Sequence, residues 1–347
     1  MRSDELDFHL PPELIAQEPA AQRSASRLLH YRKQDRSIAH RTFSDLPNLL
    51  RAGDLLVFND ARVIPARFTL RKSTGGRIEG LFISEDRPGQ WQVMLRNLGP
   101  ITEPIPLAFA DEPTLTALAT GRTADGNYEL RVDTTQRATD VLERHGRMPL
   151  PPYIRRDKDR DARDATDRER YQTVFANRAT AVAAPTAALH FTPELLNELD
   201  ARGVHRTFVT LDVGLGTFKP LSSDTLEGHA MHRETYSVSP EAATAINAAK
   251  QDGRRVIAIG TTAARVLESQ PVDRPIQAGS SSTAIFIYPP YEWRWVDALV
   301  TNFHLPRSTL IALVAALVGL DGQRRIYAEA IAKQYRFFSY GDAMFVE

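Results

Sequence analysis

Six short runs of alternating residues constrain the fold of this chain more than any other feature of its sequence. They lie between residues 66 and 150, and turn pairs such as Gly-Gly, Pro-Gly and Asp-Gly separate several of them. Strands this short, with little helix between them, predict a small antiparallel β-barrel or sandwich. The runs cover residues 67–71, 77–83, 91–96, 104–109, 115–120 and 128–132.

The segments on either side of these runs have the pattern of an α/β protein. Residues 55–58 are continuously apolar, as in the buried strands of parallel sheets. Helical patterns alternate with the later apolar runs, so we expect a large three-layer α/β domain with a small antiparallel β-barrel domain inserted in it. The large domain would comprise residues 1–65 and 151–347, and the barrel residues 66–150. The later strands are expected at residues 205–213, 254–260, 284–288 and 296–302.

The composition excludes several kinds of chemistry. The 347 residues include no cysteine, which removes disulfides, thiolate zinc sites, iron–sulfur clusters and cysteine nucleophiles. Basic and acidic residues both number 43, so net charge gives no hint of a nucleic-acid partner, although a neutral total can hide a basic face. The N-terminal residues do not have the pattern of a signal peptide, and the longest apolar run, residues 310–318, is too short to span a bilayer. We expect a cytoplasmic protein without membrane contact.

Polar side chains follow two of the predicted strands directly. Asn59, Asp60 and Arg62 come after the first apolar run, and Asn302 and His304 lie at the end of the last. Sheets of α/β proteins bind ligands at the carboxyl ends of their strands, so these residues are candidate substrate contacts. An Asx turn formed by Asn59 and Asp60 explains the first group equally well.

Residues 183–191, AAPTAALHF, lie just before a predicted helix. Pro185 and Thr186 indicate a turn, and His190 and Phe191 come next to the helix N-terminus, where free amides favour an anion. This placement makes the four residues candidates for a substrate site. In the alternative interpretation, Phe191 packs against the helix and His190 binds a local carbonyl group.

A glycine-rich turn follows the strand predicted at residues 205–213. Gly214 and Gly216 allow a ligand to approach the backbone closely, while Thr217 and Phe218 supply a hydroxyl group and a ring. The dinucleotide fingerprint G-x-G-x-x-G is not completed, so a nicotinamide site of the Rossmann type is disfavoured.

Two later stretches also carry polar residues in apolar surroundings. A strand, a Gly-Thr-Thr turn and a helix with Thr261 and Arg265 could cradle an anion, although an ordinary helix cap fits as well. The aromatic C-terminal segment contains Tyr340, Gly341 and Asp342. Core packing explains its rings better than it explains this tripeptide.

Two charged stretches were weighed for metal and RNA binding. His229, His232 and Glu234 lie close together, but no HExxH pattern is present, and we expect no metal. Residues 155–170 interleave basic and acidic side chains. They could grip an RNA backbone, but a solvated hinge or surface helix accounts better for the alternating acids.

Long matches in a fixed order resemble one family, the S-adenosylmethionine:tRNA ribosyltransferase-isomerases of queuosine biosynthesis. Asp212 stands where that family usually has histidine, and Ala188 where it usually has glycine. The matching stretches are GDLLVFNDARVIPAR, GRMPLPPYI, RERYQTVFA, AAPTAALHFTPELL, VTLDVGLGTFKP, GTTAARVLES, IFIYPPY, DALVTNFHLPRSTL and RFFSYGDAM.

The resemblance implies an α/β domain with a β-barrel insertion, and it implies a reaction. Similar enzymes transfer and isomerise the ribosyl part of S-adenosylmethionine onto 7-aminomethyl-7-deazaguanine in the wobble position of a tRNA anticodon. Epoxyqueuosine in tRNA is the product, and adenine and methionine are released. No metal or redox cofactor is implied beyond S-adenosylmethionine as co-substrate, and we expect a monomer.

This chemistry requires a base, an acid for the departing adenine, and aromatic or negative surface around a sulfonium cation. The candidates for proton transfer and electrostatics are His190, Asp212, His304 and Asp342. The candidates for substrate contacts are Asn59, Asp60, Arg62, Pro185, Thr186, Phe191, Gly214, Gly216, Thr217, Phe218, Thr261, Arg265, Asn302, Tyr340 and Gly341.

Two other functions are compatible with parts of the sequence. A different ribosyl- or nucleotide-binding enzyme could use the same glycine-rich turns, and it would act on a free base or nucleotide. A non-catalytic RNA-binding module could use the barrel alone, but it would not need so many polar residues at strand ends.

Overall fold

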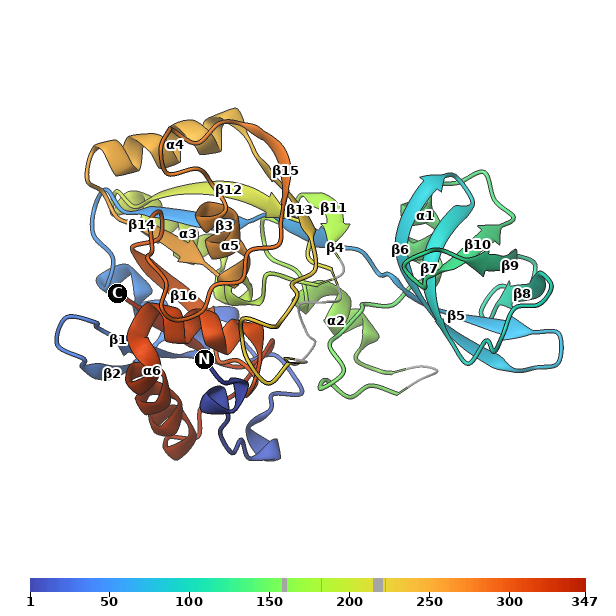
Figure 1. The fold of residues 1–347 in the computed structure, drawn as a ribbon, viewed down its shortest axis with the longest axis horizontal. Coiled ribbons are helices and arrows are strands. Elements are labelled where there is room, and N and C mark those ends of the chain that lie inside the picture. Colours follow the sequence, from blue (N-terminus) through green and yellow to red (C-terminus); the bar gives the residue numbers. More distant parts are fainter. Residues whose placement is uncertain (158–160, 182, 215–220, 222) are drawn as a thin grey trace.

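The apolar run at residues 55–58 forms strand β3 (Leu55–Asn59), which lies in the middle of one large sheet. The computed structural model describes residues 1–157, 161–181, 183–214, 221 and 223–347. Within these residues, nine strands form a mixed sheet in which β12, β3, β14 and β16 are parallel neighbours (Figure 1). The order is β15 (Gly279–Thr283), β13 (Glu234–Val238), β12 (His205–Leu211), β3, β14 (Val256–Ile259), β16 (Ala298–Asn302), β17 (Ala343–Val346), β1 (Arg27–Tyr31) and β2 (Ile38–Thr42).

Alternate residues of β3 point to opposite faces of the sheet, which is the reason for three layers. Leu55 and Val57 pack with α4 (Pro240–Gln251), α5 (Thr261–Glu268) and α6 (Thr309–Ala332). Leu56 and Phe58 pack on the other face with α3 (Pro193–Ala201) and with the 3-10 helices η4 (Phe43–Asn48) and η5 (Thr186–His190). The expected α/β architecture is confirmed. The N-terminal region adds the short 3-10 helices η1 (Ser3–Leu6), η2 (Pro12–Leu14) and η3 (Arg23–Ala25).

All six alternating runs are strands of a closed antiparallel barrel, which Figure 1 shows beside the large sheet. The barrel has its own core, in which Phe68, Trp91 and Phe109 contact one another and α1 (Ala138–His145) contributes Val141 and Leu142. The strands are β5 (Arg67–Lys72), β6 (Arg77–Arg87), β7 (Gln90–Arg96), β8 (Ile105–Phe109), β9 (Thr116–Arg122) and β10 (Tyr128–Val132).

The chain enters and leaves the barrel at neighbouring points. Arg67 and Arg147 exchange backbone hydrogen bonds of 3.1 and 2.7 Å. Before the entry, β4 (Ala61–Val63) pairs with β11 (Arg178–Ala181), and after the exit the chain forms α2 (Asp164–Arg170). We propose residues 66–150 as the inserted unit, because the hydrogen bonds between Arg67 and Arg147 join its two ends.

One predicted strand is wrong. Residues 284–288 form no strand, and β15 (Gly279–Thr283) precedes them. Strand pairing uses the backbone, so this largely exposed, serine-rich edge strand carries no apolar signal. The apolar side chains of Ile285, Phe286 and Ile287 instead pack against the core of the large sheet. None of the helices in the described ranges is long and apolar enough to cross a membrane.

Candidate functional site

The carboxyl ends of the four parallel strands lie at one edge of the large sheet, and several polar residues meet there. Asn59, Asn302 and the turn before Thr261 end three of these strands. Strand β17 runs antiparallel to β16, with Asn302 opposite Ala343, so Asp342 also reaches this edge. The expectation that strand ends bring polar side chains together therefore holds for this group.

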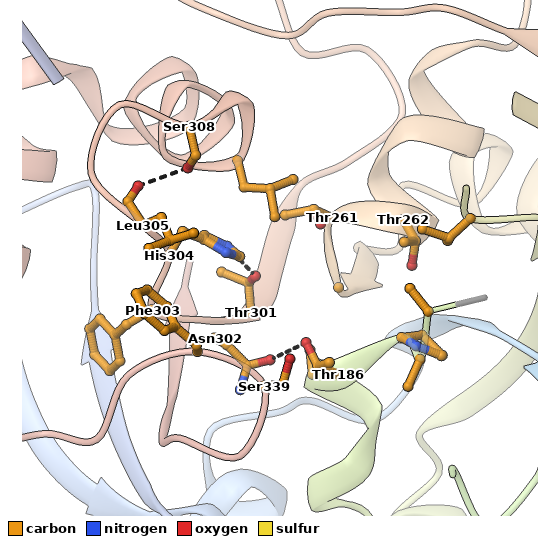
Figure 2. Close-up of a pocket in the computed structure, with 18 of the residues that line it drawn as sticks. Thr186, Thr261, Thr262, Thr301, Asn302, Phe303, His304, Leu305, Ser308 and Ser339 are labelled. Carbon is orange, nitrogen blue, oxygen red and sulfur yellow. Dashed lines mark hydrogen bonds between the residues drawn. The ribbon is translucent and has the colours of Figure 1, made fainter. Parts of the chain in front are cut away.

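A pocket of about 700 Å³, partly open to solvent, lies at this edge. Five predicted site residues line it, namely Pro185, Thr186, Thr261, Asn302 and His304. Figure 2 shows His304 and Thr301 on one side of the space and Thr186 and Thr262 on the other. The further lining residues are Tyr153, Ala183, Ala184, Ala187, Val213, Gly260, Thr262, Thr301, Phe303, Leu305, Ser308, Leu310, Phe338 and Ser339.

Asn302 connects three segments at the base of the pocket. Thr186 Oγ1 donates to Asn302 Oδ1 at 2.9 Å (Figure 2). Asn302 Nδ2 donates to the Asp342 carbonyl oxygen at 3.3 Å and lies 3.2 Å from His190 Nε2. Because an amide NH2 group only donates, His190 Nε2 accepts and its ring proton lies on Nδ1. One side chain thus joins three of the stretches that carry the family resemblance.

His190 is buried behind Asn302 and does not line the pocket. Its ring packs on Phe43, with the ring centroids 4.8 Å apart. Burial, against a hydrogen bond to the Arg23 backbone and together with the charges of Arg23 and Arg336, lowers the pKa of His190 to about 4. The imidazole is therefore neutral at pH 7, and its contact with the site runs through Asn302.

His304 lines the pocket directly. Its Nε2 lies 2.9 Å from Thr301 Oγ1, and its backbone N–H donates to the Tyr327 hydroxyl at 3.1 Å. Burial lowers the pKa of His304 to about 3, so this ring is also neutral at pH 7. If Nε2 donates to Thr301, Nδ1 keeps the lone pair that a proton acceptor requires.

The two buried histidines predict acid sensitivity. Below the ordinary histidine pKa of 6.5 the unfolded chain binds protons that folded His190 and His304 do not, so stability falls as pH decreases. Urea unfolding between about pH 7 and about pH 4.5 should show a loss of up to about 1.4 kcal/mol per pH unit for each histidine. Asp342, whose pKa burial raises, partly offsets this loss.

His304→Gln should remove the share of the pH slope that belongs to His304. His205→Gln is the matched control, because the His205 side chain is exposed and its surroundings change little on unfolding. An unchanged slope in His304→Gln would contradict the burial argument.

The residues after β3 make strand-end contacts instead of lining the pocket. Asn59 Oδ1 accepts from the Leu211 and Ala61 amides, both at 3.1 Å, and Asp60 Oδ1 accepts from Thr210 Oγ1 at 2.6 Å. Arg62 is exposed on β4. These contacts fit the turn interpretation, while a substrate contact by Asn59, Asp60 or Arg62 stays a prediction.

Four further candidates support the pocket from behind. Phe191 is fully buried and meets Phe43 and Phe58 edge-on, with ring centroids 5.0 and 4.9 Å apart. The Tyr340 hydroxyl donates to Asp167 at 2.8 Å, and Asp342 accepts from two backbone amides. A β-carbon built on Gly341 would lie 2.4 Å from the Arg336 carbonyl oxygen, which is too close for any residue other than glycine. This segment therefore holds Phe338 and Ser339 in the pocket wall.

The remaining candidates gather beside α5. Arg265 forms a buried ion pair with Glu234, whose second oxygen accepts from the Gly214 amide at 3.1 Å. Asp212 is half-buried, and its Oδ1 has no hydrogen-bond partner within the described residues. The candidates Gly216, Thr217 and Phe218 lie outside the described residues.

Sequence reasoning missed five polar residues of the pocket, namely Tyr153, Thr262, Thr301, Ser308 and Ser339. Tyr153 lies in the matching stretch GRMPLPPYI, and its hydroxyl is 2.7 Å from Ser339 Oγ. Ser308 precedes a strongly apolar run and caps α6, a pattern that sequence could have revealed. Thr262 lies in the Gly-Thr-Thr turn that could cradle an anion, but only Thr261 of the two threonines was named as a candidate.

A pocket at the carboxyl edge of a mixed α/β sheet, lined by a neutral histidine and by convergent hydroxyl and amide groups, is the arrangement of an enzyme that binds a small molecule. The chain belongs to the queuosine biosynthesis protein family, whose model, described as "Queuosine biosynthesis protein", matches residues 3–346. That match includes the barrel as well as both parts of the large sheet.

Relatives of this chain carry one enzyme name. A protein of Geobacter sulfurreducens named S-adenosylmethionine:tRNA ribosyltransferase-isomerase is 49% identical over 347 residues, covering 99% of this chain and 98% of the relative. A protein of Aromatoleum aromaticum with the same name is 48% identical, covering 99% and 96%. A crystal structure described as S-adenosylmethionine tRNA ribosyltransferase from Thermotoga maritima is 35% identical, with a TM-score of 0.55, covering 99% and 100%.

Proposed function

We propose that this chain transfers and isomerises the ribosyl moiety of S-adenosylmethionine onto 7-aminomethyl-7-deazaguanine in the wobble position of tRNA. The products are epoxyqueuosine-tRNA, adenine and methionine. The family membership and the shared name of its relatives support the reaction class. S-adenosylmethionine is the co-substrate, and the proposal includes no metal or redox cofactor. A cytoplasmic monomer fits this role.

The observation that carries the proposal is the electrostatic character of the pocket. Lys and Arg are missing from the described residues that line it, and His304 is neutral at pH 7. A sulfonium cation can therefore enter without meeting a fixed positive charge. Phe338 and Tyr153 supply aromatic rings, which attract cations through their faces.

The two titratable side chains that line the pocket suit opposite proton-transfer roles. The sulfonium acidifies the 5′ carbon of the ribose, and in this proposal neutral His304 accepts that proton. Burial raises the pKa of Tyr153 to about 12, so its hydroxyl stays protonated and can donate towards the departing adenine. At pH 7 His304 is therefore in the form that can accept a proton, and Tyr153 is in the form that can donate one.

The modified base of the tRNA must leave the anticodon stack to reach this pocket. We propose that the barrel contacts the tRNA. Residues 155–170 provide less support for such a contact, because Arg156 forms a buried ion pair with Asp167 at 2.7 Å and Arg163 pairs with Asp161 at 2.7 Å. These ion pairs within the stretch agree with its interpretation as a hinge or surface helix.

Release of free adenine tests the proposal. The protein is mixed with S-adenosylmethionine and tRNA that carries the aminomethyl-deazaguanine, and adenine is followed by chromatography. Adenine should form only when both substrates are present, and the tRNA mass should increase. The control is the same tRNA with unmodified guanine. Adenine release with a free base alone would indicate a different ribosyl enzyme, and tRNA binding without release would indicate a binding module.

A further inference from the structure

Helix α5 begins at the pocket without a capping side chain. Its N-cap residue, Gly260, lines the pocket with a φ of 92°, and the described residues supply neither a side-chain cap nor an acid in the first turn. The helices α3, α4 and α6 are capped by Thr192, Ser239 and Ser308. The amides of residues 261–263 therefore have no acceptor within the helix.

The side chain of Thr262 is a second, independent observation at the same place. Thr262 is 7% exposed and lines the pocket, and its Oγ1 has no hydrogen-bond partner in the described part of the chain. A β-carbon built on Gly260 would lie 3.6 Å from this oxygen, so the hydroxyl lies next to the helix N-terminus. Buried hydroxyl groups without partners are uncommon and costly, which indicates a ligand that completes the site.

The charge of the missing ligand follows from the surroundings. The N-terminus of α6 reaches the same pocket through Ser308 and Leu310, so two helix dipoles present their positive ends to it. Asp and Glu are missing from the described lining residues. An anion is therefore favoured next to Thr262, where amide and hydroxyl donors can bind it.

We propose that the amides of residues 261–263 and the Thr262 hydroxyl bind the carboxylate of the methionyl part of S-adenosylmethionine. This assignment rests on the proposed function. It places the methionyl chain against α5 and leaves the sulfonium and ribose facing His304 on the opposite side of the pocket. Thr262 is then a specificity residue that distinguishes S-adenosylmethionine from related sulfonium compounds that lack the carboxylate.

Equilibrium binding of two ligands to two proteins tests the proposal, without tRNA and without turnover. Wild type and Thr262→Val are titrated with S-adenosylmethionine and with decarboxylated S-adenosylmethionine. The variant should bind S-adenosylmethionine about 10-fold more weakly, as expected for the loss of one hydrogen bond to a charged group. Its affinity for the decarboxylated ligand should equal that of wild type. Thr262→Ser should restore binding of the intact ligand.

Thr244→Val is the matched control, since Thr244 is exposed on α4, and its Oγ1 donates to the Pro240 carbonyl oxygen. It should bind both ligands as wild type does. Equal weakening of the two ligands by Thr262→Val would overturn the carboxylate assignment and leave the proposed function intact. In a separate titration with tRNA, a Thr262→Val variant that binds tRNA more weakly but S-adenosylmethionine as wild type does would overturn the assignment in favour of a tRNA phosphate. The proposed function is tested separately, since only the absence of adenine release with both substrates present would overturn it.

Discussion

Replacing His304 with Ala is expected to lower the turnover for adenine release by roughly 10²–10⁴-fold, the usual contribution of a general base. Among the described residues that line the pocket, His304 supplies the one imidazole, and we propose that it accepts the ribose proton. Affinity for S-adenosylmethionine, measured separately by equilibrium dialysis, should change by less than about 10-fold, because the neutral ring is not needed to hold the cation. Added imidazole should restore part of the turnover.

His190→Gln is the control for this prediction. His190 is as deeply buried as His304, with 4% and 8% of their surfaces exposed, but it does not line the pocket. A glutamine carbonyl can still accept from Asn302 Nδ2, so turnover should fall by less than about 10-fold. If His190→Gln loses as much turnover as His304→Ala, or if imidazole restores nothing, His304 is not the base and His190 becomes the better candidate.

The largest loss of stability is expected from Glu234→Ala. This change leaves the guanidinium of Arg265 buried without its counter-charge and removes the acceptor of the Gly214 amide. Breaking a buried ion pair from one side typically costs about 3–5 kcal/mol in the free energy of unfolding. Urea unfolding of the purified variant measures this loss.

Glu198→Ala is the matched control on the surface. Glu198 pairs with Arg202 at 2.8 Å across one turn of α3, and both side chains are more than two-fifths exposed. Its removal should cost only about 0.3–0.5 kcal/mol. The double change Glu234→Met with Arg265→Leu should recover much of the loss, because no unpaired charge then remains buried. Equal losses in Glu234→Ala and Glu198→Ala would contradict the burial argument.

The barrel could be predicted from sequence because its signals are local. Alternation between buried and exposed side chains and the turn pairs between runs determine each hairpin without reference to the rest of the chain. The strand at residues 279–283 was missed for the opposite reason. It pairs with β13 through backbone hydrogen bonds, and its exposed, serine-rich sequence does not have the apolar pattern that predicts a strand.

The location of the site could be predicted from sequence, but the contacts between its side chains could not. Polar residues at strand ends identified Asn302 and His304, and both line the pocket. The sequence could not show that His190 contacts the site through Asn302, because that contact joins residues 112 positions apart. It also gave no reason to prefer Thr262, whose importance depends on an unpartnered oxygen in three dimensions.

The position of β17 between β16 and β1 also bears on how the chain reaches its native state. Arg27 and Asp342, 315 positions apart, are hydrogen-bonded beside the register in which Leu28 pairs with Ala343. Closing so large a loop is entropically slow, and chains with high contact order fold slowly. Refolding from denaturant should therefore include a late phase in which the β1–β2 hairpin docks. Until that phase ends, the edge of β17 that pairs with β1 is exposed and open to aggregation.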